Sequence, residues 1–252
     1  MDTSFDHVMI RVEDLEESFA WYTENFGYEE RSRWEADTFT NVKLGVPGDT
    51  EDDVTLELTY NHDGRTYESG DAWGHIAIRT DDVYGANDML MENGVPDYRD
   101  PDSCGGNIAF VKDPDGHQIE LVTSSKTPEF SIDHVMTRVE DLDQALGFWQ
   151  RKFEFVEKGR WEANTFANHF VGPEDASENA MRLELTYNYD GRSYTMGDGW
   201  GHLAIATDEE IEPAWETLME REAEDYRDPP SNNYSYAFTK TPDGHEIEVF
   251  GK

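Results

Sequence analysis

The sequence predicts an α+β fold of four β-α-β-β-β modules, paired into two tandem domains of the same kind. The first observation is an internal repeat. The segment Leu-Glu-Leu-Thr-Tyr-Asn at residues 56–61 returns at 183–188, and Trp-Gly-His at 73–75 returns at 200–202. Both pairs have the same offset, since 183 − 56 and 200 − 73 equal 127. A repeat of this kind sets the domain count, so we expect domains at residues 1–125 and 130–252.

The second observation is the order of elements inside each half. Residues 5–12 are rich in β-branched and apolar types and predict a strand. Asp14 is placed to cap a helix with Glu17 at the capping-box position, and Gly27 marks its end. The pattern predicts three further strands, at about 28–35, 38–46 and 53–61.

The same order follows in the next stretch of the chain. It predicts a strand at 75–80, a helix at 83–93, and strands near 97–100, 107–112 and 117–123. Pro-Asp-Gly at 114–116, between two apolar runs, predicts a hairpin turn and recurs at 242–244. With the repeat of both modules after a polar linker at 123–129, the chain contains four modules.

Composition narrows the class of protein. The net charge is −36, with 56 acidic and 20 basic residues, and the acids are spread over the chain rather than gathered in a tail. This coat predicts a halophilic protein and disfavours nucleic acid and anionic membranes as partners. A single cysteine, Cys104, excludes an internal disulfide and suits the cytoplasm. No apolar run is long enough for a transmembrane helix, and no signal peptide is expected.

Histidine and glutamate recur inside the apolar strands of all four modules. Each module places a His in its first strand and a Glu in its last, and these residues are His7, Glu57, His75, Glu120, His134, Glu184, His202 and Glu248. A buried carboxylate without a partner is costly, so buried charged groups are normally paired or bound to metal. Two imidazoles and two carboxylates suit a divalent cation with positions left open for substrate, with Ni, Co or Zn favoured and Mn or Fe as alternatives.

Other repeated residues point to structure. His117 and His245 follow the hairpin turns and are expected at the surface, and His62 and His169 have no counterpart in the other half. We expect the matched pairs Trp34 with Trp161 and Phe39 with Phe166 to lie in the core. A nucleophilic role for Cys104 is disfavoured because no repeated base lies near it.

These motifs resemble the glyoxalase I family of the vicinal oxygen chelate superfamily. The resemblance rests on Asp-His-Val-Met at 6–9, Leu-Glu-Leu-Thr-Tyr-Asn at 56–61, Trp-Gly-His at 73–75 and Pro-Asp-Gly-His-Gln-Ile-Glu at 114–120, with their second copies. It covers nearly the whole chain. It implies paired half-barrels in one chain, a pseudo-dimer that needs no second copy, and one divalent metal per site.

The resemblance also implies a reaction. The hemithioacetal of methylglyoxal and a low-molecular-weight thiol would be isomerised to the S-lactoyl thioester, by a carbon–sulfur lyase that serves methylglyoxal detoxification. A glutamate would move a proton from C1 to C2, with Glu120 and Glu248 as the first choice and Glu57 and Glu184 as the second.

Two arrangements of the metal ligands stay open. In homodimeric relatives each site draws ligands from two subunits, which would group His7, Glu57, His202 and Glu248 in one site here and leave the other four residues for the second. The alternative keeps each site within one half of the chain.

Thiol recognition is where the sequence departs from the family. The residues that would hold a γ-glutamyl group are matched by Arg11, Asn61, Arg138 and Asn188. A lysine for the glycine carboxylate of glutathione is not evident in the matching segments 103–107 and 231–235. We therefore expect a glutathione-like thiol, with γ-glutamylcysteine as one that fits.

Three other readings compete within the same fold. An extradiol dioxygenase needs two His and one carboxylate on iron, so the fourth ligand, Glu57 or Glu184, argues against it. An acyl-CoA epimerase typically shows Gln at those positions. A binding protein of this superfamily that lacks metal would not be expected to keep eight ligands.

Overall fold

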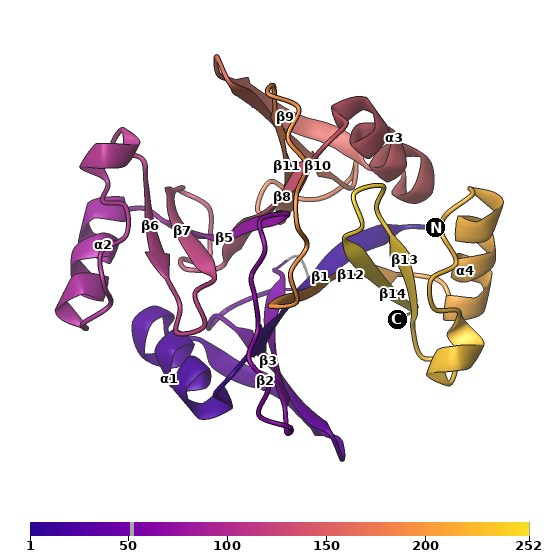
Figure 1. Cartoon of the computed structure of the whole chain (residues 1–252), viewed down its shortest axis with the longest axis horizontal. Coiled ribbons are helices and arrows are strands. Elements are labelled where there is room, and N and C mark those ends of the chain that lie inside the picture. Colours follow the sequence, from indigo (N-terminus) through magenta and orange to yellow (C-terminus); the bar gives the residue numbers. More distant parts are fainter. Residues whose placement is uncertain (51–52, 252) are drawn as a thin grey trace.

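The chain folds into two seven-stranded sheets with the helices on their outer flanks (Figure 1), and the computed structural model describes residues 1–50 and 53–251. The first module contains β1 (Thr3–Val12), α1 (Leu15–Phe26), β2 (Glu29–Glu35), β3 (Phe39–Gly45) and β4 (Thr55–Asn61). The second contains β5 (Trp73–Thr80), α2 (Val83–Glu92), a 3₁₀ turn at Asp102–Cys104, β6 (Ile108–Lys112) and β7 (Gln118–Thr123).

The second half repeats this order. The third module contains β8 (Ile132–Val139), α3 (Leu142–Phe153), β9 (Val156–Glu162), β10 (Phe166–Gly172) and β11 (Arg182–Asn188). The fourth contains β12 (Trp200–Thr207), α4 (Ile211–Glu220), a 3₁₀ turn at Pro229–Asn232, β13 (Ala237–Lys240) and β14 (Glu246–Gly251). The predicted fold class is confirmed.

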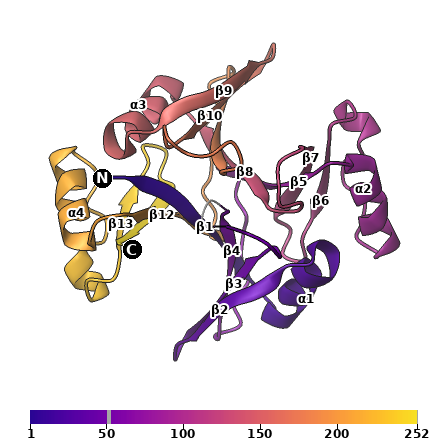
Figure 2. The ribbon, with the colours of Figure 1, turned by 180° about the vertical axis from the view of Figure 1, so that it is seen from behind.

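The sheets exchange modules between the halves of the chain. The first sheet has the order β13-β14-β12-β1-β4-β3-β2, and the second has β6-β7-β5-β8-β11-β10-β9. Antiparallel pairing of β1 with β12 and of β5 with β8 makes these junctions. Both views of the ribbon show the first and fourth modules side by side (Figures 1 and 2). Each sheet therefore joins one module from each half.

Local signals explain where α1 begins and ends. The Asp14 side chain accepts hydrogen bonds from the backbone N–H groups of Glu16 and Glu17, which satisfies donors that the first helical turn leaves free. Gly27 ends the helix in the left-handed region, with φ of 68°. Asp141 caps α3 in the same way, while Glu154 takes the left-handed position at its end.

Where the structure differs from the sequence prediction, strand position is the reason. The strand expected near 97–100 shrinks to an isolated bridge between Arg99 and Phe110. Trp34 and Trp161 are exposed rather than in the core, because they lie on β2 and β9, the edge strands of their sheets. Each instead meets the phenylalanine of its own hairpin edge-on, Phe39 and Phe166 respectively.

The expectation that His117 and His245 lie at the surface is wrong. Both side chains are buried, because the hairpin turns carry them inward to the seam between the two halves. There the Nε2 atom of His117 lies 3.1 Å from the carbonyl oxygen of Gly199, and that of His245 lies 3.3 Å from the carbonyl oxygen of Ala72. The Pro-Asp-Gly motif predicts the hairpin turn, but it does not indicate which distant segment of the chain packs against the histidine that follows it.

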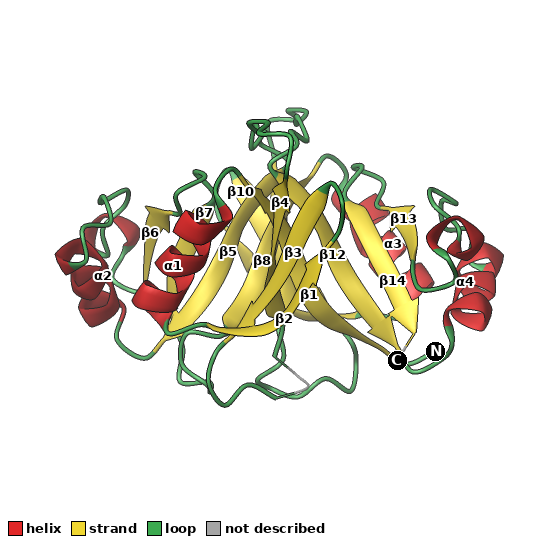
Figure 3. Ribbon diagram, turned by 90° about the horizontal axis from the view of Figure 1, so that it is seen from below, coloured by secondary structure: helices red, strands yellow, loops and turns green. Residues whose placement is uncertain are grey.

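Two loops, residues 62–72 and 189–199, hold the seam together. The N–H groups of Asp71 and Ala72 donate to the carbonyl oxygen of Thr195, and those of Asp198 and Gly199 donate to the carbonyl oxygen of Glu68. At Gly70 and Gly197 the loops approach so closely that a side chain there would clash. A Cβ added at Gly70 would lie 2.3 Å from the Thr195 oxygen, and one at Gly197 the same distance from the Glu68 oxygen. The helices stay at the flanks, away from this centre (Figure 3).

Candidate metal centre

The inner strands of each sheet carry two histidines and two glutamates to one point. In the first sheet β1, β4, β12 and β14 are neighbours, and they carry His7, Glu57, His202 and Glu248, which we call the first site. In the second sheet β5, β7, β8 and β11 carry His75, Glu120, His134 and Glu184, which we call the second site. Of the two groupings left open by the sequence, the structure has the one in which each site draws on both halves.

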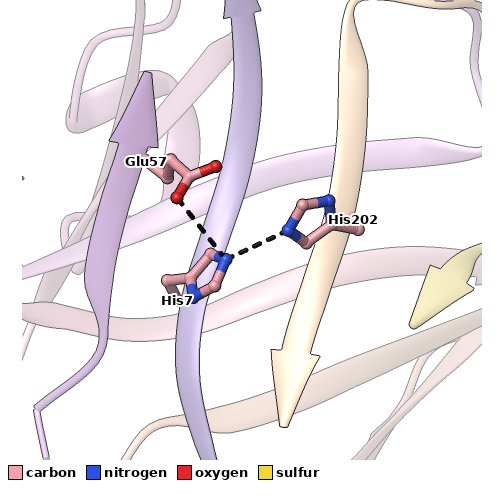
Figure 4. Close-up of side chains that lie close together, drawn as sticks. All are labelled: His7, Glu57 and His202. Carbon is pink, nitrogen blue, oxygen red and sulfur yellow. Dashed lines mark hydrogen bonds and ion pairs between the residues drawn. The ribbon is translucent and has the colours of Figure 1, made fainter. Parts of the chain in front are cut away.

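In the first site the polar atoms converge within hydrogen-bonding range. The Nε2 atoms of His7 and His202 lie 3.0 Å apart and face each other (Figure 4). A Glu248 carboxylate oxygen lies 3.2 Å from the first and 3.1 Å from the second. Glu57 approaches from β4, with an oxygen 3.8 Å from the His7 Nε2 atom. Of these groups, His7, Glu57 and His202 each place a ligand atom within 4.8 Å of the other two.

The second site repeats the geometry with small differences. The Nε2 atoms of His75 and His134 lie 3.2 Å apart. A Glu120 oxygen lies 2.7 Å from the former and 3.2 Å from the latter. Glu184 lies closer than its counterpart, with an oxygen 3.0 Å from the His134 Nε2 atom. Its other oxygen accepts a hydrogen bond from the Thr186 hydroxyl.

Burial strengthens the electrostatic interactions between the His and Glu side chains of each cluster. Burial disfavours the charged form of His7, but the hydrogen bonds that its ring donates to the carboxylates of Asp6 and Glu248 outweigh burial and raise the pKa of the imidazole to about 9. Burial likewise favours the neutral form of Glu248, yet the hydrogen bonds of His202 and His7 hold its pKa well below the usual range. The same opposition lowers the pKa of Glu120 and raises that of His134. Each cluster therefore needs positive charge among its carboxylates.

The donor set fits a divalent cation. Mixed imidazole nitrogen and carboxylate oxygen ligation is suited to first-row metals such as Ni, Co and Zn, as well as Fe and Mn. A hydrogen bond between the two facing Nε2 atoms requires one of them to carry the proton, whereas both can donate a lone pair to one ion when neither is protonated. His7, Glu57 and His202 lie close enough to hold an ion together, as do His75, Glu120 and His134.

A second layer of residues orients the ligands, and the sequence prediction missed it. Asp6 and Asp133, each directly before a site histidine, accept a hydrogen bond from the Nδ1 atom of His7 and of His134. Such a carboxylate fixes the ring orientation and makes Nε2 the free nitrogen. The repeated Asp-His dipeptide was a signal that could have identified both aspartates. Asn41, which donates to Glu57 at 2.9 Å, carried the repeat signal as well, since it recurs as Asn168 at the offset of 127.

The predicted substrate-binding residues lie at the ends of the same strands. Arg11 donates through Nη1 to the carbonyl oxygens of Asp198 and Trp200, and Arg138 makes the matching contacts to Asp71 and Trp73. The amide of Asn61 donates to the Tyr67 hydroxyl, and that of Asn188 to the Tyr194 hydroxyl. Arg11 also lines a cavity of about 450 Å³, together with Arg65, Tyr67, Trp200, Lys240 and Glu246, and the four first-site residues are not part of its lining.

The other histidines singled out in the sequence lie apart from both clusters. The ring of His62 lies 2.9 Å from the Thr40 hydroxyl, on the exposed end of the β3–β4 hairpin. His169 pairs with Glu157 across β9 and β10 at 2.7 Å. Cys104 is partly buried in the 3₁₀ turn after α2, where its neighbour Ser103 is its hydrogen-bond partner.

Comparisons with known proteins identify the family of the chain. The Glyoxalase/Bleomycin resistance protein/Dioxygenase superfamily matches the chain twice, over residues 4–121 and 131–249. A lactoylglutathione lyase of Arabidopsis thaliana is 36% identical over 212 residues, covering 81% of this chain and 74% of the relative. A lactoylglutathione lyase of Schizosaccharomyces pombe is 30% identical over 245 residues, covering 81% of each chain.

Solved structures extend the similarity to the whole fold. The crystal structure of glyoxalase I from Zea mays superposes with a TM-score of 0.87 and 28% sequence identity. The match covers 99% of this chain and 92% of the maize chain. All eight site residues lie within the two segments that match the superfamily. No helix in residues 1–50 and 53–251 is long and apolar enough to cross a membrane.

Proposed function

The chain belongs to the Glyoxalase/Bleomycin resistance protein/Dioxygenase superfamily and, within it, to the lactoylglutathione lyases, and we propose that it is a metal-dependent glyoxalase I. Its substrate would be the hemithioacetal of methylglyoxal and a small thiol, and its product the S-lactoyl thioester. The observation that carries the proposal is the presence of two complete clusters of two His and two Glu, each assembled from both halves of the chain.

We propose that each cluster holds one divalent cation. In the first site His7, Glu57, His202 and Glu248 would be the ligands, and in the second His75, Glu120, His134 and Glu184. A bound cation would supply Lewis-acid polarisation of the substrate oxygens. The protein's own residues would do the rest: position the substrate, keep water out of a buried site, and move the proton.

Contacts to neighbouring residues support the last-strand glutamate as the base. Asn41 holds Glu57 and Thr186 holds Glu184, so these two carboxylates are tied in place. Among the described residues, Glu248 and Glu120 have only the site histidines as partners, and a cation would take those nitrogens. Once substrate displaces it from the cation, either carboxylate would be free to take the proton from C1 of the hemithioacetal and return it to C2.

The residues around the sites also support a proposal for which thiol forms the hemithioacetal. Arg11 with Asn61, and Arg138 with Asn188, would hold the γ-glutamyl end, since the structure leaves Nε and Nη2 of both arginines without a bond among the described residues. We propose γ-glutamylcysteine as a substrate thiol, because segments 103–107 and 231–235 contain no lysine for a glycine carboxylate.

One observation favours glutathione as the second candidate thiol. Arg99 lies over the ring of Phe110, 4.5 Å from its centroid, and that ring packs edge-on against His75. Arg227 repeats this with Phe238 beside the first site. Glu246 already neutralises Arg227 at 2.7 Å, so Arg99 is the freer cation for a carboxylate.

An assay on metal-free protein tests the whole proposal. Each of Ni, Co, Zn, Mn and Fe would be restored at molar salt, methylglyoxal added with glutathione or with γ-glutamylcysteine, and thioester formation followed by absorbance. We expect turnover with at least one metal. Higher kcat/KM with γ-glutamylcysteine would support the proposed thiol, and equal or better turnover with glutathione would refute it. No product with any pair would refute the glyoxalase proposal.

We also propose the setting in which the enzyme works. The acidic surface supports a halophilic protein, and the single cysteine supports the cytoplasm. Because two modules from one chain already complete each sheet, we propose that the protein acts as a monomer in which the domains at 1–125 and 130–252 take the place of two subunits. Gel filtration at molar salt tests this, with the mass of a dimer as the contrary result.

A further inference from the structure

The two sites have the same ligand types but differ in the residues around them, most directly at one position on the neighbouring strand. Lys43 on β3 corresponds to Phe170 on β10, since 170 − 43 equals the repeat offset of 127. Each residue occupies the same place in its sheet, directly across from the site glutamate: Lys43 pairs with Glu57 and Phe170 with Glu184. One site therefore has an ammonium group where the other has an aromatic ring.

In the first site Lys43 and Asp6 both contact the Nδ1 atom of His7, the nitrogen that faces away from the site. Its Nζ atom lies 2.9 Å from the His7 Nδ1 atom and 3.1 Å from an Asp6 oxygen. The same Asp6 oxygen lies 2.7 Å from the His7 Nδ1 atom. Three polar atoms thus form a triangle behind the imidazole, on the side away from His202.

An ammonium group can only donate, so with the neutral imidazole that metal binding requires this triangle has two hydrogen-bonding solutions. If Nδ1 of His7 donates to Asp6, its Nε2 lone pair is free for a cation, but two donors then lie 2.9 Å apart. If Nδ1 instead accepts from Lys43, the ring proton sits on Nε2, where a cation would bind. The second solution competes with the tautomer that metal binding needs.

In the second site only the first of these arrangements is possible, with the proton on Nδ1 and the Nε2 lone pair free for a cation. The Nδ1 atom of His134 donates to Asp133 at 3.0 Å, and the ring of Phe170 meets the imidazole edge-on with 5.4 Å between centroids. Phe170 has no hydrogen to donate to Nδ1. The cation that serves this carboxylate, Arg182, reaches the Asp133 oxygen at 2.6 Å while its guanidinium lies over the Phe170 ring.

The carboxylates behind the two histidines are also held differently. Asp133 is buried, with 2% of its side chain exposed, and Lys126 and Arg79 lie 3.5 and 4.0 Å from it in addition to Arg182. Asp6 is 32% exposed and has Lys43 as its only ion-pair partner besides His7 among the described residues. A buried carboxylate with several fixed partners orients its histidine more firmly than one open to solvent.

We propose that Lys43 makes the first site the weaker of two unequal metal sites, and that Phe170 and the Asp133 network make the second the tighter one. The proposal rests on the proposed function only in taking the two clusters as metal sites. It concerns the affinity for the cation and not the reaction, so the two can fail separately.

A competition titration of the metal-free protein with Zn²⁺ and a chelating indicator, at molar salt and neutral pH, tests the proposal. We expect two dissociation constants that differ by about tenfold or more, which is the range seen when residues behind a metal ligand are changed. The variants His202→Ala and His75→Ala, each leaving one intact site, assign the weaker constant to the first site.

Exchange of the two residues gives the matched test. Lys43→Phe copies the second site and should tighten the weaker constant about tenfold, and Lys43→Met should do the same without adding a ring. Phe170→Lys should weaken the tighter constant. Circular dichroism of each metal-free variant checks that the fold is intact, and Lys43→Met introduces no larger side chain.

Three results would overturn the proposal. These are equal constants in the native protein, a weaker constant that resides in the second site, and a weaker constant that Lys43→Phe and Lys43→Met both leave unchanged. Loss of thioester formation with two unequal constants still present would refute the proposed function alone.

Discussion

The indole rings of Trp73 and Trp200 stack on each other at the seam between the two halves, with 5.0 Å between centroids and 1° between planes. The stack joins both sheets, because Trp73 begins β5 and Trp200 begins β12. Each ring also meets a buried histidine edge-on, His245 and His117 respectively. A site histidine follows two residues after each tryptophan. The stack therefore positions the starts of β5 and β12, the strands that carry His75 and His202.

Removing one ring of the stack should cost much stability. We expect Trp200→Ala to lower the free energy of unfolding by about 3–5 kcal/mol, because it leaves a cavity against Trp73 in a buried seam. Urea unfolding at molar salt measures the loss. Trp34→Ala is the matched control, since its side chain is 56% exposed and should change stability by no more than about 0.5 kcal/mol. Similar losses in both variants would contradict the role given to the stack.

Metal content should fall one site at a time. Each of His202→Ala and His75→Ala removes one nitrogen ligand, so we expect bound zinc to drop from about two ions per chain to about one. Elemental analysis after gel filtration gives the number. His62→Ala, at an exposed position outside both sites, should keep both ions. A variant of either site histidine that keeps two ions would refute its assignment as a ligand.

Substituting the last-strand glutamates, Glu120 and Glu248, should have a different effect from substituting Glu57 and Glu184. We expect the double variant Glu120→Gln with Glu248→Gln to lower kcat by about 10²–10⁴ if these are the bases. The double variant Glu57→Gln with Glu184→Gln should lose more metal, since these carboxylates are the ones held in place by neighbouring donors. Parallel measurements of kcat and metal content distinguish the pairs, and the reverse pattern would exchange their roles.

A buried histidine should make the protein less stable in acid. His245 has a pKa lowered to about 4 by burial, and the unfolded chain has its ordinary value of 6.5. The unfolded state therefore binds more protons below pH 6.5. The stability of the protein is therefore unaffected by this histidine above pH 6.5. As the pH falls from 6.5 toward 4, the free energy of unfolding decreases by up to about 3 kcal/mol.

The equivalent residue in the other half shows how to remove this effect. Burial also disfavours the charged form of His117, but Asp113 lies 3.0 Å from its Nδ1 atom and raises its pKa. His245 has the hydroxyl of Thr241 in that place. We expect Thr241→Asp to make the loss of stability between pH 7.5 and 5 smaller than in the native protein, as measured by urea unfolding at both pH values. An equal loss in both proteins would contradict this account.

Salt should be needed for the fold. With a net charge of −36, repulsion acts over about 10 Å at 0.1 M salt and over about 3 Å at 1 M. We expect circular dichroism to show loss of structure on dialysis to millimolar salt, and its return when salt is restored. Unchanged spectra and activity at low salt would refute the halophilic assignment.

The sequence by itself determined the four modules, because strand and helix signals, caps and hairpin turns depend on residues close together in the chain. It also identified the eight residues that the structure gathers into two clusters. Repeated spacing made this possible: a single buried His or Glu has an ordinary explanation, while four pairs at offsets of 127 or 128 do not. The Asp-His dipeptides at 6–7 and 133–134 carried the same signal for the residues behind the ligands.

Only the tertiary structure decided which modules share a sheet, and therefore that His7 meets His202 rather than His75. Both groupings use the same residues with the same local patterns, so nothing short of the β1–β12 pairing could choose between them. The burial of His117 and the exposure of Trp34 had the same cause, since each depends on what packs against a strand. The contrast between Lys43 and Phe170 was visible as two letters, but its meaning required the 2.9 Å contact with His7.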